Sequence, residues 1–424
     1  MYLLYSLLLA LGFVLAIPVY LWKGRATGKY VRTFHERMGR LPNGLNPAGS
    51  RSIWIHAVSV GEVLAARTLV RPLRQRFPSH RMFASTTTLT GNAVARVSLS
   101  DADGLFFAPF DWVSPVRRVL EELDPHLLLL VETEIWPNLV HQARRRGTRI
   151  AVVNGRISPR SFPRYLRIRP FFKSVLAEVD LFLMQGDVDA ARILEMGAPP
   201  DRVRVTGNLK FDALGEAATP ELLARIVDAG SRGPLWVAGS TVDGEEQMVL
   251  DAFRIVRAQL PTTSLLIAPR HAERFAAVPG IVEAAGFRCL RRTALQAGGW
   301  TNGQVVVLDT LGELAQVYPL ATVVFVGGSL VPSGGHNILE AAVAGKAVIV
   351  GPHMENFQEI ADAFRAEDAM VQVRSPRVLA DEVLRLLTDD GRRREVGERA
   401  RRLVERNRGA LRQTLDALSA LAGC

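Results

Sequence analysis

Acidic and basic side chains that could carry out group transfer follow short apolar runs in this 424-residue sequence. Glu62 ends the motif HAVSVGE, in which a predicted strand turns through Gly61 into a predicted helix. Glu132 directly follows the most apolar run, and Lys210 lies in TGNLKFD. A carboxylate can accept a proton from an attacking hydroxyl, and charged groups can stabilise charge that develops in a transition state. These residue types therefore indicate proton transfer and charge stabilisation.

Each of these residues also has an ordinary structural interpretation. An acid in the first turn of a helix, such as Glu62, is stabilised by the helix dipole, which should also keep the carboxylate ionised. Glu132 and Glu134 could simply end a strand, although alternate side chains of a strand point the same way and their proximity would raise one pKa. Lys210 could be an exposed surface lysine. The residues alone leave both interpretations open.

Two neighbouring carboxylates could also attract a divalent metal. No DxD motif or histidine cluster stands beside Glu132 and Glu134, however, and metal sites need such ligands. We therefore expect no metal ion and no other cofactor. The two cysteines, Cys289 and Cys424, lie far apart, which excludes a disulfide framework or a thiolate zinc site and favours a reduced, cytosol-facing body.

A second set of polar residues lies in glycine-rich and proline-rich loops of the C-terminal half. The segment GGSLVPSGGHN precedes a predicted helix, and loop amides before a helix N-terminus can bind phosphate. Asn337 and Glu340 also match a capping box, and both roles could hold together. Arg270 fits a phosphate or base contact, with an ordinary surface arginine as the alternative. Three histidines lie in the same loops: His271, His336 and His353.

These residues are positioned by short apolar runs, which are typical of strands buried on both faces. They alternate with amphipathic stretches such as residues 62–77, which implies right-handed βαβ units and parallel sheets. The runs of the N-terminal half are residues 52–57, 81–85, 104–108, 126–132, 149–154 and 180–185. Those of the C-terminal half are residues 235–240, 264–269, 304–309, 322–328, 347–351 and 369–373.

We therefore expect two doubly wound α/β domains, because 424 residues exceed one compact core. The N-terminal domain is predicted over residues 23–212, an interdomain linker over 213–233, and the C-terminal domain over 234–424. A long basic helix, roughly residues 391–421, should close the C-terminal domain. In such sheets ligands bind beyond the carboxyl ends of the strands, which is where the polar motifs lie.

The first 22 residues contain no charged side chain, and basic residues follow from Lys23 to Arg40. About twenty apolar residues can cross a bilayer as a helix, and the basic flank places the body on the cytoplasmic side. We therefore predict a single membrane anchor over residues 1–22. A cleaved signal peptide would need positive charge before the apolar run. A helix that enters one leaflet without spanning remains the alternative, and Pro18 favours it slightly.

The chain carries 52 Lys and Arg against 42 Asp and Glu, a net charge of +10, which favours an anionic partner. Residues 156–173 hold six basic residues and no acidic one. This segment would suit anionic lipid headgroups or acceptor phosphates, with a solvated helical face as the alternative. A nucleic-acid-binding protein is less well supported, because no RRM, KH or helix-turn-helix signature is present.

Seven motifs, in order and across nearly the whole chain, resemble the bacterial 3-deoxy-D-manno-octulosonic acid (Kdo) transferase family. They are HAVSVGE, ETEIWPNL, TGNLKFD, PRHAERF, DTLGEL, FVGGSL and GGHNILEAA. The resemblance implies a GT-B fold, in which two Rossmann-like domains face a cleft behind an N-terminal membrane-anchor helix. It also implies an inverting, metal-independent transfer of Kdo from CMP-Kdo to a phosphorylated, acylated glucosamine disaccharide. This lipid A precursor would be modified at the cytoplasmic face of the inner membrane, in lipopolysaccharide core biosynthesis.

The family's roles fall on matching positions of this sequence. The resemblance makes Glu62 the proton acceptor and makes Glu132 and Lys210 transition-state stabilisers. The residues that would hold the CMP of the donor are Pro269, Arg270, Leu311, Gly312, Glu313, Asn337, Ile338, Leu339 and Glu340. The runner-up hypothesis is a GT-B transferase that uses a UDP-sugar and another lipid acceptor. A noncatalytic membrane scaffold would not depend on the three charged residues at all.

Overall fold

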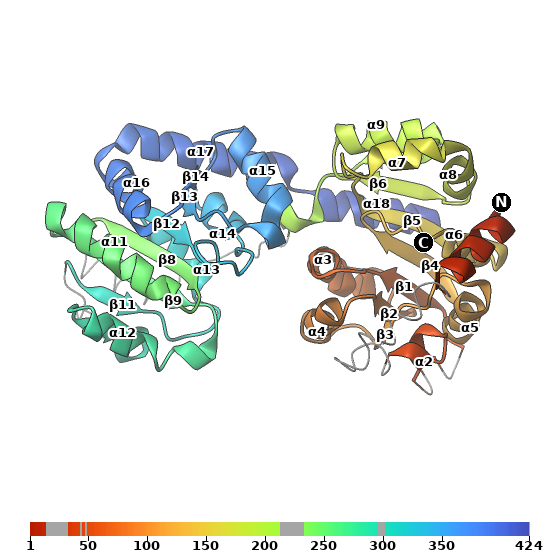
Figure 1. Cartoon of the computed structure of the whole chain (residues 1–424), viewed down its shortest axis with the longest axis horizontal. Helices are drawn as coiled ribbons and strands as arrows, with labels where there is room; N and C mark the ends of the chain where they lie inside the picture. The colour runs from red at the N-terminus through yellow and green to blue at the C-terminus, as the bar shows by residue number, and fades with distance from the viewer. Residues whose placement is uncertain (14–32, 43–44, 47–48, 213–232, 296–301, 424) are drawn as a thin grey trace. The chain divides into compact units, whose positions relative to one another are not determined.

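The computed structural model describes residues 1–13, 33–42, 45–46, 49–212, 233–295 and 302–423. The chain divides into two compact units, Met1–Ala213 with Asn407–Cys424 and Leu214–Arg406. Over the described residues each unit contains one seven-stranded sheet, and the strands pair in parallel (Figure 1). Two doubly wound α/β units confirm the predicted fold class.

The first sheet has the strand order β3-β2-β1-β4-β5-β6-β7. Its strands are β1 Ser52–His56, β2 Arg81–Thr86, β3 Gly104–Phe107, β4 Pro125–Val131, β5 Arg149–Gly155, β6 Leu181–Met184 and β7 Val203–Val205. From β1 the chain passes to one edge and then returns to β4 on the other side of β1. Ligands bind at such a topological switch point in doubly wound sheets.

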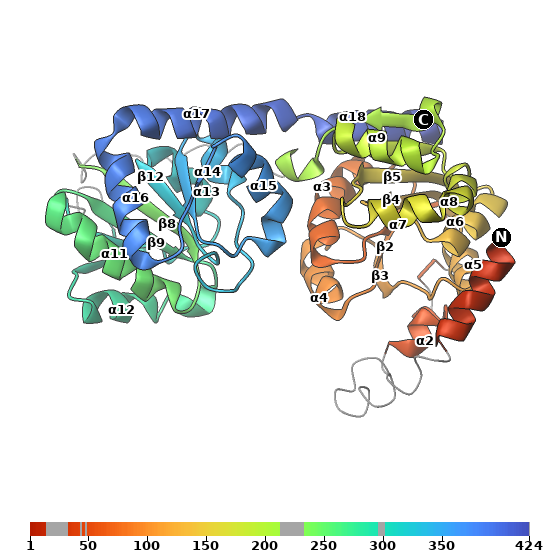
Figure 2. The ribbon, with the colours of Figure 1, turned by 45° about the horizontal axis from the view of Figure 1, so that its top comes forward.

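Helices cover both faces of this sheet (Figure 2). Leu128 and Leu130 of β4 lie in the core beneath α5, α6, α8 and α9, whereas Leu127 and Leu129 lie in the core beneath α3, α4 and α18. The helices of this unit are α2 Phe34–Arg37, α3 Val60–Arg76, α4 Leu89–Ser98, α5 Val113–Leu123, α6 Pro137–Arg145, α7 Phe162–Arg167, α8 Arg169–Leu176, α9 Asp187–Met196 and α18 Ala410–Ala422. An apolar run buried on both faces is thus confirmed for β4.

The second sheet has the order β10-β11-β9-β8-β12-β13-β14. Its strands are β8 Leu235–Thr241, β9 Ser264–Pro269, β10 Cys289–Arg291, β11 Val305–Val307, β12 Val323–Val326, β13 Ala347–Val350 and β14 Val371–Gln372. Its helices are α11 Glu245–Gln259, α12 Val278–Ala284, α13 Leu314–Val317, α14 Leu339–Val343, α15 Gln358–Ala366, α16 Pro376–Thr388 and α17 Asp390–Asn407. The chain reverses direction across the sheet between β8 and β12, which makes these two strands the switch point of this unit.

Every apolar run predicted as a strand contains one, but the sequence did not reveal β7 and β10. Both are three-residue strands at the edge of a sheet, and both are largely exposed or half-buried. Neither strand lies in a longer buried run, so no hydrophobic pattern marks it, whereas the two-residue edge strand β14 is flanked by the buried Ala369, Met370 and Val373.

The C-terminal boundary differs from the prediction. Instead of one closing helix, α17 ends at Asn407, Gly409 adopts a left-handed conformation (φ 94°), and α18 packs on the first unit. Ala410 and Leu418 of α18 are fully buried in the same core as α3. This long-range packing, which local sequence does not encode, assigns residues 407–424 to the first unit. Apart from Gly233, the predicted linker 213–233 lies outside the described residues.

The described part of the N-terminal helix covers residues 2–13. Two tyrosine hydroxyls hold this helix against the rest of the first unit. Tyr2 donates to Glu178 and Tyr5 donates to Asp111, each at 2.8 Å. The rest of the predicted anchor, residues 14–22, lies outside the described residues. Among the helices that are described, none combines the length and apolar character needed to cross a bilayer.

Replacing Asp212 by Ala should destabilise the first unit. The Asp212 carboxylate accepts hydrogen bonds from the Gly409 amide (2.8 Å) and the Leu411 amide (2.6 Å), so it caps the N-terminus of α18 from a distant segment. Loss of such a cap should lower the free energy of unfolding by about 1–2 kcal/mol. Urea denaturation measures the change, with the exposed Asp201→Asn as control. A midpoint equal to that of wild type would contradict this role.

Candidate active site

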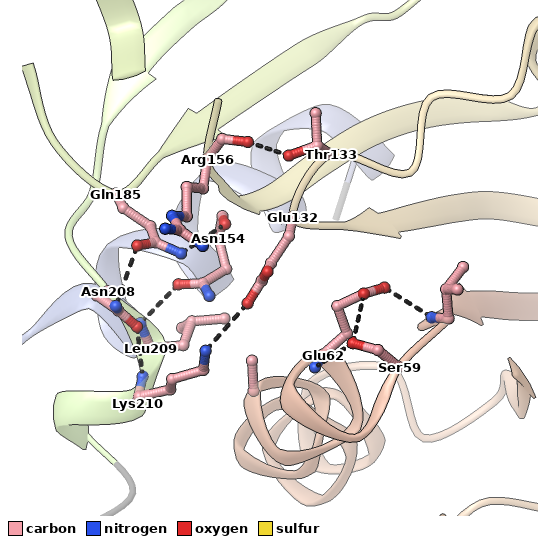
Figure 3. A network of polar contacts seen from close by, with 12 residues as sticks. Ser59, Glu62, Glu132, Thr133, Asn154, Arg156, Gln185, Asn208, Leu209 and Lys210 are labelled. Carbon is pink, nitrogen blue, oxygen red and sulfur yellow. Dashed lines mark hydrogen bonds and ion pairs between the residues drawn. The ribbon is translucent and has the colours of Figure 1, made fainter. Parts of the chain in front are cut away.

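Glu62 lies in the first turn of α3, immediately beyond the carboxyl end of β1 (Figure 3). Ser59 is the N-cap of this helix, and its hydroxyl donates to Glu62 Oε1 at 2.6 Å. The Val58 amide donates to Glu62 Oε2, also at 2.6 Å. The Ser-x-x-Glu spacing of Ser59 and Glu62 is a capping-box pattern that the sequence analysis missed. The structural interpretation of Glu62 as part of a helix cap is therefore confirmed, and its place at a strand end is also compatible with the predicted catalytic role.

Glu132 and Lys210, which are far apart in the sequence, form an ion pair beside this helix. Lys210 Nζ lies 3.1 Å from Glu132 Oε1, and the two side chains are only 13% and 16% exposed. The exposed-lysine interpretation of Lys210 is therefore wrong. A Cβ atom on Gly61 would lie 3.9 Å from Lys210 Nζ, so the ammonium also approaches the turn that carries Glu62. The structure thus brings the three predicted charged residues together at the switch point between β1 and β4.

The backbone conformation of Glu132 sets the direction of its side chain. Glu132 has a left-handed conformation (φ 60°), which is uncommon for a residue with a side chain and often marks functional sites. Its amide donates to the carbonyl of Val153 in β5 at 2.9 Å, so the left-handed turn comes directly after the ladder that holds β4. The conformation is therefore imposed by the surrounding sheet.

Two asparagines that the sequence analysis did not select position Lys210. Asn154 Oδ1 accepts a hydrogen bond from the Leu209 amide at 2.9 Å, and Asn208 Oδ1 accepts one from the Lys210 amide at 3.0 Å. Asn208 Nδ2 in turn donates to Gln185 Oε1 at 3.0 Å. Figure 3 shows these side chains gathered around the short 3₁₀ turn that carries Lys210. Asn154 ends an apolar run predicted as a strand, and Asn208 lies in the TGN motif. These two positions were the only sequence features that could have indicated a role for the asparagines.

The electrostatics of Glu62 correct one expectation. Burial raises its pKa to about 8, and the charges of Glu134 and then Glu132 add to this effect, while the hydrogen bonds from Ser59 and Val58 oppose it. Glu62 is only 6% exposed. The prediction that the helix dipole keeps its carboxyl ionised is therefore wrong, because burial outweighs the dipole. A carboxyl with a pKa near the working pH is a stronger base than an ordinary one.

Glu134 completes the carboxylate cluster. Its Oε2 accepts a hydrogen bond from Trp136 Nε1 at 2.8 Å, and burial followed by the charge of Glu132 raises its pKa. The Trp136 ring packs edge-on against the fully buried His56 at 4.8 Å between ring centroids. The predicted proximity effect on a carboxyl pKa is therefore confirmed. Within the described residues, no three or more His, Cys, Asp or Glu side chains are arranged to hold a metal ion.

Most of the residues predicted to bind the CMP donor lie in loops beyond the strands of the second sheet, whereas Pro269 ends β9 and Leu339 and Glu340 begin α14. Arg270 follows Pro269 at the end of β9, and it is exposed. Burial, followed by the nearby Arg270 and His271, lowers the pKa of His336 to about 4. Because these charges act on the His336 ring, the PRH and GGHN loops converge. They bring one arginine and two protonatable imidazoles together, and this set suits an anionic ligand.

The glycine-rich loop differs from the prediction. The amides of Gly328, Ser329 and Leu330 donate to the buried carboxylate of Glu245, at 2.6, 2.9 and 2.8 Å. They are therefore already occupied by an internal anion, and the expected phosphate contact through these amides is not supported. The sequence analysis missed Glu245 because its partners in this loop lie more than 80 residues away.

Asn337 and Glu340 show the capping geometry only in part. Asn337 Oδ1 accepts from the Leu339 amide at 3.1 Å and Asn337 Nδ2 donates to Glu340 Oε1 at 3.3 Å. The N-cap position of α14 is, however, occupied by Ile338, which makes no side-chain cap hydrogen bond. The Ile338 and Leu339 side chains are buried, so they can contribute to ligand binding only through their backbones.

The third segment predicted to bind the CMP donor, residues 311–313, follows β11. Leu311 is 75% exposed, and Gly312 has a left-handed conformation (φ 83°). Glu313 pairs with Arg292 at 3.0 Å and accepts from Thr310 at 2.7 Å. Since β11 pairs with β9, this loop and the PRH loop leave the same edge of the sheet.

Replacement of Glu62 by Gln tests its pKa through protein stability. A carboxyl with a folded-state pKa of about 8 and an ordinary value of 4.5 holds its proton more tightly when folded. Wild-type stability should therefore fall as pH rises through this window, whereas Glu62→Gln cannot titrate there. Between pH ~5.5 and ~8.5, the free energy of unfolding of wild type should fall by about 2 kcal/mol or more relative to that of Glu62→Gln, as measured by urea denaturation at both pH values. Parallel pH dependences would contradict the raised pKa.

Two family models match this chain, one in each half. Residues 32–213 match the family model described as 3-deoxy-D-manno-octulosonic-acid transferase (kdotransferase), and residues 247–403 match glycosyl transferases group 1. The calicheamicin glycosyltransferase structure aligns with 88% of this chain and 98% of its own, at a TM-score of 0.52 and 15% identity. This likeness shows the fold alone, and it confirms the predicted GT-B class.

Sequence relatives cover almost the whole chain. The 3-deoxy-D-manno-octulosonic acid transferase of Haemophilus influenzae is 34% identical over 396 residues, which are 92% of this chain and 91% of the relative. The transferase of the same description from Bordetella pertussis is 35% identical, over 96% of each chain. This chain therefore belongs to the 3-deoxy-D-manno-octulosonic acid transferase family of glycosyltransferases.

Proposed function

We propose that this enzyme moves Kdo from CMP-Kdo to a hydroxyl of a lipid A precursor, with Glu62 as the proton acceptor. The observation that carries this proposal is the buried Glu62 carboxyl, with its raised pKa, beside the Lys210–Glu132 ion pair. The acceptor oxygen would form a bond to the anomeric carbon of Kdo while the bond from that carbon to the phosphate oxygen breaks. CMP then leaves, and the hydroxyl proton passes to Glu62. Attack opposite the leaving group inverts that carbon.

Lys210 and Glu132 would stabilise the charges that develop during transfer. An oxocarbenium-like transition state is positive and favours a nearby carboxylate, whereas the departing phosphate is negative and favours an ammonium group. Because the two side chains are mostly buried, their fields are screened less than those of surface charges. We expect this step to need no metal ion.

The donor would bind the second unit. Arg270, His271 and His336 offer positive or protonatable groups to the anionic phosphate, and a bound phosphate would favour the protonated form of His336. The exposed Leu311, with the backbone of Gly312, would provide an apolar surface for the base. Asn337 and Glu340, which bond each other, would provide polar groups for the ribose.

An apolar groove in the first unit supports a lipid acceptor. It has a volume of about 1680 Å³ and is lined by residues of the N-terminal helix, of α2 and of the loops after β2, β3 and β4. Trp136 contributes to its wall and donates a hydrogen bond to Glu134, so the groove borders the carboxylate cluster. Acyl chains would occupy the groove while the sugar hydroxyl reaches Glu62.

The surroundings of the groove suit an acidic lipid surface. Arg164 lines it, and other cations of the basic segment, including Arg160 and Arg167, are exposed nearby in the chain. Leu3, Leu7 and Leu11 of the N-terminal helix are more than half exposed. Exposed apolar side chains next to cations favour attachment to anionic membranes. We propose that the enzyme works on the cytoplasmic face of the inner membrane, with the N-terminal segment as its anchor.

Transfer should depend strongly on Glu62. With CMP-Kdo generated in situ, a tetraacylated lipid A precursor and EDTA, mass spectrometry should detect Kdo addition by wild type. Glu62→Ala should lower kcat by about 10²–10⁴-fold, because a general base contributes an effect of that size. The exposed Glu121→Gln serves as control. Addition by wild type and Glu62→Ala alike would remove Glu62 from the mechanism. No addition by folded wild type would favour a UDP-sugar donor instead.

A charge in the groove should discriminate against acylated acceptors. Leu89 lines the groove at the start of α4, where a helix tolerates an acid well. Leu89→Asp should therefore fold and raise KM for the tetraacylated acceptor by about 10-fold or more, since acyl chains would desolvate the new charge. Leu89→Met is the matched control. An equal change in KM for a deacylated acceptor would contradict acyl-chain binding in the groove.

A further inference from the structure

Two consecutive glutamates, Glu245 and Glu246, open α11 just beyond the carboxyl end of β8. Both are fully buried, at 0% exposure, although glutamates at the start of a helix are usually solvated. A buried carboxylate needs hydrogen-bond or ionic partners to offset the loss of water. Those partners identify what the two residues do.

Glu245 binds the glycine-rich loop after β12. Besides the amides of residues 328–330, it accepts a hydrogen bond from the Val242 amide at 3.2 Å. A Cβ atom on Gly327 would lie 2.7 Å from Glu245 Oε2, so only glycine permits this approach. A Cβ atom on Gly328 would lie equally close to the His336 ring. The glutamate therefore fixes the backbone against which His336 packs.

Glu246 binds the loop after β9. Arg274 forms a two-pronged ion pair with it, with Nε and Nη2 each 3.0 Å from a carboxylate oxygen. The Arg274 amide donates to the His271 carbonyl at 3.0 Å, which closes the turn that follows Arg270. Thr241, whose carbonyl accepts from the Arg270 amide at 2.8 Å, also donates its hydroxyl to Glu246 at 3.4 Å. Both ends of the PRH loop are thus tied to one carboxylate.

We propose that Glu245 and Glu246 are positioning residues for donor binding. Glu245 holds the loop under His336, and Glu246 holds the loop that carries Arg270 and His271. Together they set the spacing of Arg270, His271 and His336, the groups that receive the anionic donor. This inference rests on the proposed donor site. Helix capping alone does not account for the contacts, because four of the amide and guanidinium partners lie 28 to 85 residues away.

The test is CMP binding to the full chain by calorimetry, together with KM for CMP-Kdo and for the acceptor. Glu245→Gln and Glu246→Gln keep the side-chain size but remove the charge and one acceptor oxygen. The matched control is Asp251→Asn, which removes a half-exposed ion pair on the same helix. Arg274→Lys keeps the charge opposite Glu246 and loses the two-pronged geometry.

Each glutamine variant should weaken CMP binding by about 10- to 100-fold, as expected when supporting contacts let binding groups drift by an ångström. KM for CMP-Kdo should rise in parallel, while KM for the acceptor and the control's CMP affinity stay as in wild type. Arg274→Lys should show a smaller loss than Glu246→Gln. A purely structural role would lower the melting temperature without moving CMP affinity in the folded variant.

The outcomes separate this inference from the donor proposal. If wild type binds CMP and folded Glu246→Gln and Arg274→Lys bind it equally well, the positioning role is wrong and the donor site stands. If wild type itself binds no CMP, the donor assignment is wrong and the inference falls with it. Should Glu245→Gln not fold, the Glu246 and Arg274 variants decide alone.

Discussion

Burial of both faces of each parallel sheet is the constraint on which the rest of this structure depends. Side chains such as Leu128 and Leu129 face opposite cores and leave no room for polar groups between the ends of a strand. Polar chemistry is therefore confined to the strand ends, and parallel strands place those ends at one edge. The switch point between β1 and β4 then brings Glu62 and Glu132 together from segments seventy residues apart.

Confinement at that edge also creates the chemistry of the site. Withdrawing Glu62 from water raises its pKa, and the neighbouring acids raise it further. Lys210 pairs with Glu132, so part of the negative charge is balanced while Glu62 remains a candidate base. The left-handed turn at Glu132 and the asparagines around Lys210 hold this arrangement. Ionisation and geometry thus come from the same packing.

The two units use a similar position in different ways. In each, the helix that follows the first strand of the sheet carries a buried glutamate in its first turn, Glu62 in α3 and Glu245 in α11. Within the part of the chain that the structure describes, the Glu62 carboxyl accepts hydrogen bonds only from its own turn, from Ser59 and Val58, and its pKa is raised beside other acids. Glu245 reaches across to three amides of a distant loop. One carboxylate is suited to react, and the other to support.

The sequence by itself determined the two α/β units, the strands that carry apolar runs and the strand-end placement of Glu62, Glu132 and Arg270, because these follow from local residue patterns. The short edge strands β7 and β10 left no such pattern. Only the tertiary structure decided the Lys210–Glu132 pair, the raised pKa of Glu62, the capture of loop amides by Glu245 and the return of α18 to the first unit. Each of these depends on burial or on contacts between residues far apart in the chain, and neither quantity is a property of a local segment.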